Sequence, residues 1–164
     1  MTQWVPLYES DRAVVKSEIA TFFEVFPGGS VWANEIDGGG YDLFLLGQER
    51  PGRIDVDAME ARLEEPAYAR AAESLREVGL GTAVELFSTY AGQDRDLKPW
   101  LLGAEINHDG NLRLQYMAGL AVNANAEQAI YNEMLRYRRF PSNLLTGREG
   151  TVRALEAALN GGGR

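Results

Sequence analysis

Cysteine is absent from the 164 residues. A chain without thiols forms no disulfide, offers no thiolate to a metal ion and carries no cysteine nucleophile. Histidine occurs once, as His108, next to Asp109 in a predicted turn. A metal site needs two or three further ligands at workable spacing, and a catalytic dyad needs a nucleophile within reach. The sequence shows neither near His108, so we expect no metal site and no catalytic histidine.

Long apolar runs are also missing. Nowhere do 18 consecutive apolar residues occur, which is the length that a membrane-spanning helix requires. The first residues, MTQWVPLYESDR, lack a basic region followed by an apolar run and a small-residue cleavage site. We therefore expect a cytoplasmic chain that is neither exported nor inserted in a membrane.

Positive charge is scarce. Lys and Arg together number 16 against 24 Asp and Glu, which gives a formal net charge of -8. This excess of negative charge repels nucleic acids and anionic membrane surfaces, and no Lys/Arg stripe with interleaved aromatic residues offsets it. A cationic ligand would be attracted instead.

The loops of two common enzyme classes are missing as well. No G-x-G-x-x-G follows a predicted strand and opens a helix, so the ordinary dinucleotide or adenosyl cofactor loop is absent. No serine lies in the strand, tight turn and helix context of a nucleophile elbow. The glycine-rich stretch 37–40 precedes a strand, which favours a hairpin turn over a phosphate-binding loop.

The residues that are present describe a globular chain. Hydrophobic residues make up 45% and charged residues 24% of a length that suits one ordinary domain with a real core. The stretch 18–48 organises the rest, because it reads as the end of a helix, a Pro-Gly-Gly break, a strand, a glycine turn and a second strand.

Periodicity places a helix at about residues 11–25, with Ser10 or Asp11 as its cap. One face of this helix is apolar, through Val15, Ile19, Phe22 and Phe26. Residues 2–7 predict an edge or terminal strand, because Pro6 disfavours a central position. Residues 31–36 predict another strand, and 41–46 a strand that is apolar on both faces from Leu43 onward and therefore covered on both sides.

The rest of the chain is mostly helical by pattern. Short acidic helices are predicted over 55–92, where clustered Asp and Glu side chains are expected on solvated faces. Residues 94–102 predict a helical turn or loop that carries Trp100 inward. After a turn at 108–111, the alternation of Leu112, Leu114 and Tyr116 predicts a short strand or an extended loop. Helices are predicted at 126–138, capped by Asn125, and at 151–159.

Several segments together carry a family resemblance: QWVPLYESD, VKSEIATFFEVFP, VWANE, GYDLFLLGQ and INHDGNLRLQYMAG. They resemble the C-terminal half of spermidine-synthase-like proteins, above all the bacterial form in which a synthase-like domain is fused to a membrane transporter domain. The resemblance covers about residues 2–146 and is most specific up to Gln48.

The resemblance implies an α/β fold, namely the distal part of a methyltransferase-type Rossmann sheet, which ends in a helix and an antiparallel strand pair. Residues 1–7 would be the end of the fifth strand, and 30–47 the sixth and seventh. On this basis we expect a distal Rossmann-like part at 1–50 and a mostly helical C-terminal region at 51–164 that packs on it.

The activity that the resemblance implies is aminopropyl transfer from decarboxylated S-adenosylmethionine to a diamine. The family's glycine-rich cofactor loop, its ribose-binding acid and the aspartate that activates the amine all precede the segment present here. We therefore expect no catalytic and no cofactor-binding residue in this chain, and no activity from the chain alone.

The diamine side of such a site could still be carried over. By resemblance it comprises Gln3 at the end of the fifth strand, Glu9 shortly after it, and Tyr41 at the start of the last strand. A carboxylate, an amide and an aromatic ring suit a cationic amine through charge pairing, hydrogen bonding and cation-π contact. Each residue also has an ordinary structural interpretation, as a terminus, a residue before a helix cap and a core side chain.

Three origins remain open at this point. The chain is a split or truncated synthase-like protein with an upstream-encoded cofactor-binding half, or a stand-alone α+β interaction module, or a fragment that begins at an internal methionine. An uncovered strand edge at residues 3–7 would be an aggregation hazard. We therefore expect self-association or a protein partner, and no nucleic acid.

Overall fold

The computed structural model describes residues 1–8, 10–36, 39–50, 52–117 and 126–161. The chain forms two compact units, each built from two separate segments. We call the first the sheet unit, with Met1–Pro51 and Ala91–Arg139, and the second the helical unit, with Gly52–Tyr90 and Phe140–Arg164. Residues 91–139 thus group with the N-terminal segment.

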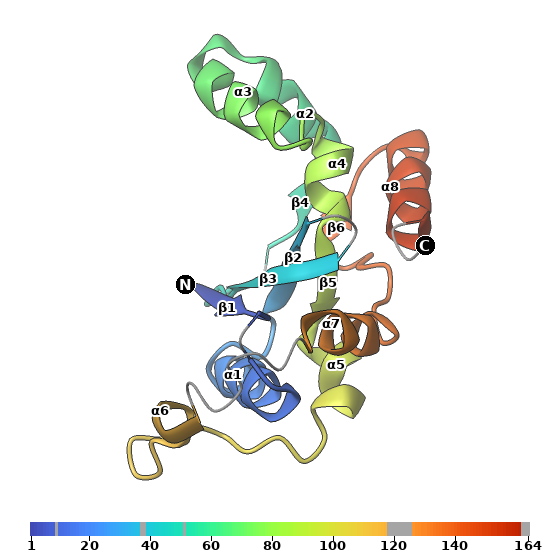
Figure 1. The fold of residues 1–164 in the computed structure, drawn as a ribbon. Helices are drawn as coiled ribbons and strands as arrows, with labels where there is room; N and C mark the ends of the chain where they lie inside the picture. The colour runs from blue at the N-terminus through green and yellow to red at the C-terminus, as the bar shows by residue number, and fades with distance from the viewer. Residues whose placement is uncertain (9, 37–38, 51, 118–125, 162–164) are drawn as a thin grey trace. The chain divides into compact units, whose positions relative to one another are not determined.

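A four-stranded sheet is the centre of the sheet unit (Figure 1). Its strands are β1 (Thr2–Pro6), β2 (Ser30–Ile36), β3 (Gly39–Leu46) and β5 (Tyr90–Gln93), in the order β1-β3-β2-β5. β3 lies between β1 and β2 and is antiparallel to both. The predicted strands and their antiparallel pairing are therefore confirmed, while residues 37 and 38 of the predicted turn lie outside the described part.

Helix α1 (Arg12–Val25) connects β1 to β2 and confirms the helix predicted from periodicity. The Asp11 carboxylate accepts the backbone N–H of Val14 at 2.8 Å, so Asp11 is the cap. The expected apolar face packs into the core, with Val15, Ile19 and Phe22 buried and Phe26 partly buried against them.

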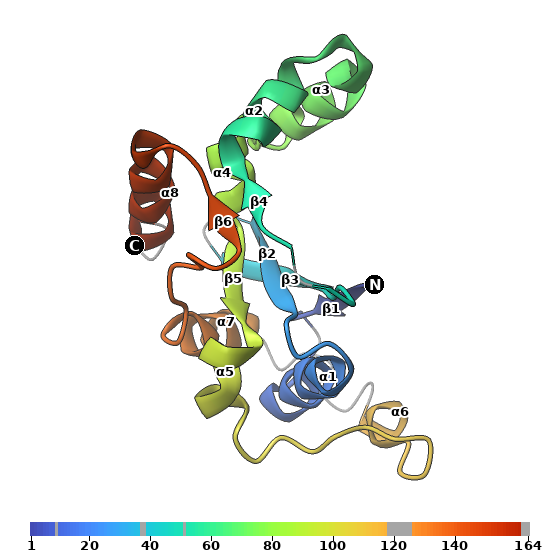
Figure 2. The ribbon, with the colours of Figure 1, turned by 180° about the vertical axis from the view of Figure 1, so that it is seen from behind.

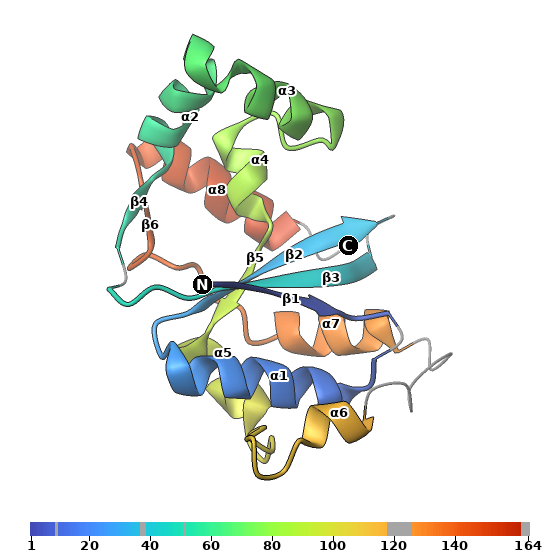
Figure 3. The ribbon, with the colours of Figure 1, turned by 90° about the vertical axis from the view of Figure 1, so that its left-hand side faces the viewer.

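The core lies on one side of the sheet. Figure 3 shows α1, α5 (Asp94–Leu101) and α7 (Glu127–Leu135) on the same side of β1, β2 and β3. Register places Val5 opposite Leu43, and Leu43 opposite Ala33, in a buried row across the three strands. The segment expected to carry Trp100 inward is helix α5, and Trp100 is only 4% exposed.

The other side of the same strands carries a row of aromatic side chains. Phe44 pairs with Trp4 on one side and with Trp32 on the other, and partners across a sheet point to the same face. Trp4 is 49% exposed and Phe44 is 40% exposed. The prediction that residues 41–46 are covered on both faces is therefore wrong at Phe44, because an antiparallel sheet can leave one face open.

The segment after the 108–111 turn also differs from its prediction. The turn itself is confirmed, because the Asn111 N–H donates to the His108 carbonyl at 3.0 Å. The residues that follow are helical, as α6 (Arg113–Met117), rather than extended. The residue predicted to cap α7, Asn125, lies outside the described part.

The helical unit contains a two-stranded parallel sheet and most of the remaining helices. Its strands β4 (Ile54–Asp55) and β6 (Leu145–Thr146) lie side by side in Figure 2. Its helices are α2 (Val56–Glu64), a 3-10 turn at Pro66–Tyr68, α3 (Ala69–Glu77), α4 (Ala83–Ser88) and α8 (Glu149–Gly161). The prediction of helix over 55–92 is wrong at residues 90–92, which belong to strand β5.

Acidic side chains expected on solvated faces hold this unit together. Asp57 in α2 accepts hydrogen bonds from the Arg148 backbone N–H at 2.5 Å and the Thr151 hydroxyl at 2.7 Å, at the start of α8. The Arg148 guanidinium pairs with the same carboxylate at 2.8 Å. Glu60 accepts the Ala83 N–H at the start of α4 at 2.5 Å. The prediction of solvated faces is thus wrong for Asp57 and Glu60, which cap helices distant in sequence.

Glycine is required at position 40 because a side chain would not fit there, not because the backbone forms a turn. A Cβ atom built on Gly40 would lie 2.3 Å from Cγ of Tyr131, whose ring packs on β3 from helix α7. The Tyr131 hydroxyl donates to the Glu35 carboxylate, and burial with this hydrogen bond raises the pKa of Tyr131 far above its usual range. The ring is therefore fixed at both ends and has little room to move.

Substituting Gly40→Ala should lower the free energy of unfolding by about 1–3 kcal/mol, because an extra methyl group would be forced against the Tyr131 ring. Urea unfolding followed by circular dichroism measures this change. Gly110→Ala is the matched control, since a Cβ there would meet nothing within 4 Å. Equal effects of the two substitutions would contradict the packing argument.

Substituting Asp57→Asn should lower the melting temperature of the helical unit by several degrees at pH 7. Its hydrogen bonds and the Arg148 ion pair hold the pKa of Asp57 below its usual range, so its stabilisation is present above pH 4 and disappears as the pH falls. Glu64→Gln, which removes an exposed charge from the same helix, is the control. Identical acid dependence of the wild type and the Asp57 variant would exclude this role.

Candidate functional site

The structure separates the residues that the sequence assigned to an amine site. Gln3 lies in β1 opposite Leu45, on the same face of the sheet as the buried residues Val5 and Leu7. Tyr41 lies four residues from Leu45 along β3, roughly 13 Å away. It is 38% exposed, and its carbonyl accepts the Leu7 N–H at 3.0 Å. Glu9 lies outside the described residues. Gln3 and Tyr41 therefore belong to opposite ends of the β1–β3 pair.

Tyr41 is instead part of a group of aromatic side chains at the carboxyl end of β1. Its ring stacks on that of Tyr8, with centroids 4.6 Å apart and planes 21° apart. The Tyr8 ring also lies 6.3 Å from that of Trp4, at 51°. We call Trp4, Tyr8 and Tyr41 the aromatic cluster. Trp4 and Tyr41 are among its exposed members, so ring surface is accessible to a ligand.

A β-bulge explains how Tyr41 comes to face Tyr8. Asn34 pairs with Asp42 but Glu35 pairs with Gly40, so Tyr41 is an extra residue of β3 without a partner on β2. An extra residue interrupts the alternation of a strand and re-aims the side chain. Tyr8 lies just beyond the end of β1, so its ring meets that of Tyr41 at this end of the β1–β3 pair.

Asp42 adds a carboxylate beside this cluster. It follows Tyr41 in β3, lies opposite Pro6 of β1 and points to the same face as Trp4 and Phe44. The side chain is 8% exposed, and its buried Oδ1 has no hydrogen-bond partner among the described residues. A buried acceptor without a donor is unfavourable. A cationic hydrogen-bond donor is the chemical group that would satisfy both the oxygen and the aromatic faces.

Sequence reasoning missed three of these four residues. The pattern at 2–7 predicts only a terminal strand around Trp4, gives no role to Tyr8, and places Asp42 inside a strand that is apolar from Leu43 onward. The alternation in WVPLY contains the signal for Trp4, because Trp4 and Pro6 share one face while Val5 and Leu7 share the buried one. The bulge at Tyr41 has no such signal in the sequence.

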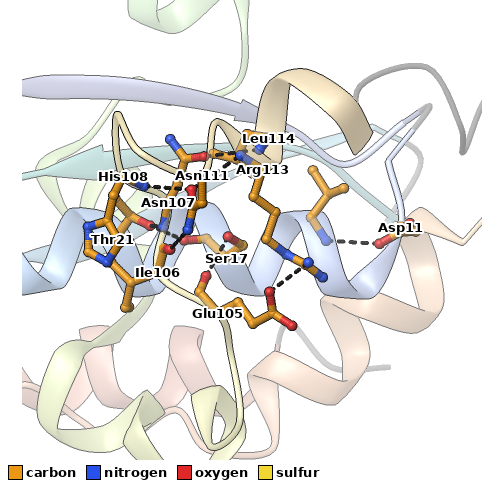
Figure 4. Close-up of polar contacts among 11 residues, drawn as sticks. Asp11, Ser17, Thr21, Glu105, Ile106, Asn107, His108, Asn111, Arg113 and Leu114 are labelled. Atoms are coloured by element: carbon orange, nitrogen blue, oxygen red, sulfur yellow. Dashed lines mark hydrogen bonds and ion pairs between the residues drawn. The ribbon is translucent and has the colours of Figure 1, made fainter.

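A second built feature is the loop of residues 105–114, which hydrogen bonds fasten to helix α1 (Figure 4). The Ser17 hydroxyl donates to the Glu105 carbonyl at 2.6 Å, and the Asn107 N–H donates to the Thr21 hydroxyl at 2.8 Å. Arg113 and Glu105 form an ion pair at 2.6 Å within the loop. Ser17 is therefore occupied by a structural contact.

Two asparagine side chains fold this loop internally. The Asn111 side chain accepts the His108 N–H at 2.9 Å and donates to the Ile106 carbonyl at 2.9 Å. The Asn107 side chain accepts the Leu114 N–H at 3.0 Å, which satisfies a donor in the first turn of α6. Leu112 takes a positive φ of 45° between them. These bonds explain why α6 replaces the predicted extended segment.

Within the described part of the chain, no group of three or more His, Asp or Glu residues is arranged to hold a metal ion. His108 is exposed and is held in the loop through its backbone. The polar groups of the loop are thus used in hydrogen bonds within the loop and to α1. The aromatic cluster with Asp42 is the stronger candidate site.

One further carboxylate in the sheet unit is perturbed. Burial raises the pKa of Glu18, on helix α1, to about 7, and its Oε2 has no hydrogen-bond partner among the described residues. A carboxyl group with a raised pKa holds its proton better in the folded state than in the unfolded state. Its contribution favours folding below pH 4.5 and is lost as the pH rises towards 7.

Substituting Glu18→Gln should therefore stabilise the protein relative to the wild type at pH 8 by roughly 1–2 kcal/mol more than at pH 4, after allowance for partial exposure of the side chain. Urea unfolding at several pH values measures the difference. Glu49→Gln, at an exposed position of the same unit, should show no such trend. A Glu18 effect independent of pH would contradict the raised pKa.

Comparisons of the chain with protein-family models, with curated proteins and with solved structures each found no match. Among the described residues, no helix combines the length and the apolar character needed to cross a membrane. The chemistry of the aromatic cluster and of Asp42 is therefore the basis on which a function is inferred.

Proposed function

We propose that this chain is the C-terminal portion of a spermidine-synthase-like aminopropyltransferase and that it contributes the amine-binding side of the site. The observation that carries the proposal is the stacked Tyr8–Tyr41 pair with Trp4 beside it, next to the partnerless Asp42 Oδ1. The ligand class is an aliphatic diamine or polyamine, bound through its ammonium groups.

The order of elements supports this proposal. A strand, a helix and an antiparallel strand pair follow one another in β1, α1, β2 and β3, as the resemblance to the distal part of a methyltransferase-type Rossmann sheet implies. The aromatic cluster lies at the carboxyl end of the strand that would be the fifth of that sheet. Of the residues expected on the amine side, Tyr41 is in this cluster.

The chemistry of the cluster supports a cation over a neutral ligand. An ammonium group over an aromatic face gains about 0.5–2 kcal/mol, and more as water is excluded. A carboxylate gives a charge-assisted hydrogen bond to the same group. The net charge of -8 adds long-range attraction of cations. Aliphatic methylenes between two ammonium groups would lie along the ring faces.

Titration of the protein with putrescine in a calorimeter tests the proposal. We expect saturable binding that weakens with salt. Tyr41→Ala should reduce the affinity roughly 2- to 30-fold, which is the range that the loss of one cation-π contact gives. Asp42→Asn should reduce it by about tenfold or more, because a hydrogen bond to a charged group is lost.

Two controls make this titration specific. Tyr116→Ala removes a tyrosine that is 73% exposed on α6, and should leave the affinity unchanged. The diol 1,4-butanediol, which has the same carbon chain without charge, should not bind. Equal binding of diol and diamine, or equal loss in the Tyr41 and Tyr116 variants, would refute an amine site at the aromatic cluster.

The same proposal limits what the chain does alone. Without a cofactor loop, the isolated chain should neither bind decarboxylated S-adenosylmethionine tightly nor transfer its aminopropyl group. Tight binding of that co-substrate would contradict the assignment to the amine side.

A non-catalytic α+β interaction module is the second candidate. The observation that favours it is the pair of exposed aromatic side chains Trp4 and Phe44, with Trp32 half-buried next to Phe44, since exposed apolar patches mark interaction sites. A module of this kind would show no preference for diamine over diol, so the titration separates the two functions.

A further inference from the structure

β1 is an edge strand, and its backbone shows which atoms face the open side. The Met1 amine donates to the Gly47 carbonyl at 2.9 Å, and the Leu7 N–H donates to the Tyr41 carbonyl at 3.0 Å. Backbone groups of an antiparallel strand alternate in direction from one residue to the next. Odd-numbered residues therefore turn their N–H and C=O groups to β3.

The even-numbered residues turn theirs the other way. Thr2 and Trp4 present an N–H and a C=O to the open edge, and Pro6 presents only a C=O because proline has no N–H. In the described part of the chain, no strand pairs with this side of β1. Position 6 is one whose N–H would not bond to β3, so proline there removes no hydrogen bond between β1 and β3 and is compatible with an edge strand.

This edge has only one of the usual protections against pairing, namely Pro6. Natural edge strands are blunted by charged side chains, by proline or by a covering element. The first eight residues, MTQWVPLY, contain no charged side chain, and Pro6 alone interrupts the donors. At the opposite end of the sheet order, all four residues of β5 are buried. Among the strands of the described residues, β1 is therefore the accessible edge.

We propose that this edge pairs with β1 of a second copy of the chain, antiparallel and around a two-fold axis at Trp4. A single accessible edge that meets its own copy closes the assembly as a dimer, because both edges are then used. A head-to-tail contact would need a second open edge, which β5 does not offer.

The register follows from the length of β1 and from Pro6. Overlap of all five residues places Trp4 opposite Trp4 of the second copy and Thr2 opposite Pro6 of the second copy. The two Trp4 residues exchange two hydrogen bonds, and each Thr2 N–H donates to the carbonyl of Pro6 across the interface. The missing N–H of Pro6 leaves only the Thr2 carbonyls without a partner, at the two ends.

The side chains favour the same arrangement. The two Trp4 rings would be neighbours on the open face, in line with Phe44 and Trp32 of each copy. Aromatic pairs across neighbouring strands stabilise a sheet. Because the strand is short and each chain has a charge of -8, the dimer should depend on protein concentration and strengthen with salt.

Sedimentation equilibrium over a range of concentrations tests the pairing. We expect a monomer–dimer equilibrium that Thr2→Pro shifts at least tenfold towards monomer, because both outer hydrogen bonds are lost while the intrachain ladder is kept. Thr2→Val keeps the N–H and is the matched control. Putrescine affinity should be the same in all three proteins, since Thr2 is outside the aromatic cluster. Failure of the dimer and failure of the amine site are then distinguishable.

Cysteine trapping gives an independent readout, because the chain has no cysteine of its own. In the proposed register the two Trp4 Cα atoms lie about 5.5 Å apart, within disulfide range. Trp4→Cys should therefore form a covalent dimer on mild oxidation. Thr2→Cys should not, because the two Thr2 residues would be roughly 13 Å apart.

A strictly monomeric wild type at the highest soluble concentration would overturn the proposal. The proposal would also be overturned by two results obtained together: Thr2→Pro does not weaken the dimer, and Thr2→Cys forms the covalent dimer as fast as Trp4→Cys. Such a dimer would use another surface. Far-ultraviolet circular dichroism of each variant shows that its fold is retained, and the trapping result stands if Thr2→Pro does not fold.

Discussion

The pairing of β3 between β1 and β2 is the constraint on which the sheet unit depends. β3 supplies the hydrogen-bond partners of both neighbours, so its register fixes the faces of all three strands. One face receives Val5, Leu43 and Ala33 and is buried under α1, α5 and α7. The other receives the aromatic row. The candidate site and the open edge are both consequences of this one register, because each lies on β1 next to β3.

The bulge at Tyr41 is the point where the sheet departs from regularity, and it has a chemical result. In a regular strand Tyr41 would share the face of Leu43 and pack in the core. The extra residue frees it to stack on Tyr8, while Asp42 keeps its place on the face of Phe44. The Tyr41 ring and the Asp42 carboxylate, from adjacent residues, thus both lie near Tyr8 at one end of the strand pair. Regular alternation would have placed them on opposite faces.

The sequence predicts the elements better than it predicts the site. Helix α1 and the β2–β3 pair follow from periodicity, a capping Asp11 and a glycine turn, all of which act over a few residues. Helix α6 does not, because Asn107 and Asn111 satisfy its first backbone donors and outweigh the alternation of Leu112, Leu114 and Tyr116. The contact between Tyr8 and Tyr41 joins residues 33 positions apart through a bulge, which no local pattern records. The resemblance groups Gln3 with Tyr41, whereas the register places the two residues at different ends of the strand pair.

The open edge of β1 links the two proposals. If the chain derives from a spermidine-synthase-like protein, the strands that bind the cofactor belong beside β1, on the side where Thr2 and Trp4 present their backbone groups. A second copy paired there occupies the same atoms, so the two partners exclude each other. Self-pairing would keep the uncharged edge covered in the absence of a cofactor-binding half and would leave Tyr8, Tyr41 and Asp42 outside the new hydrogen bonds. The two proposals meet at Trp4, whose ring belongs to the aromatic cluster and whose backbone lies on the proposed two-fold axis. They are separable through Tyr41, which only amine binding uses, and through Thr2, which only the pairing uses.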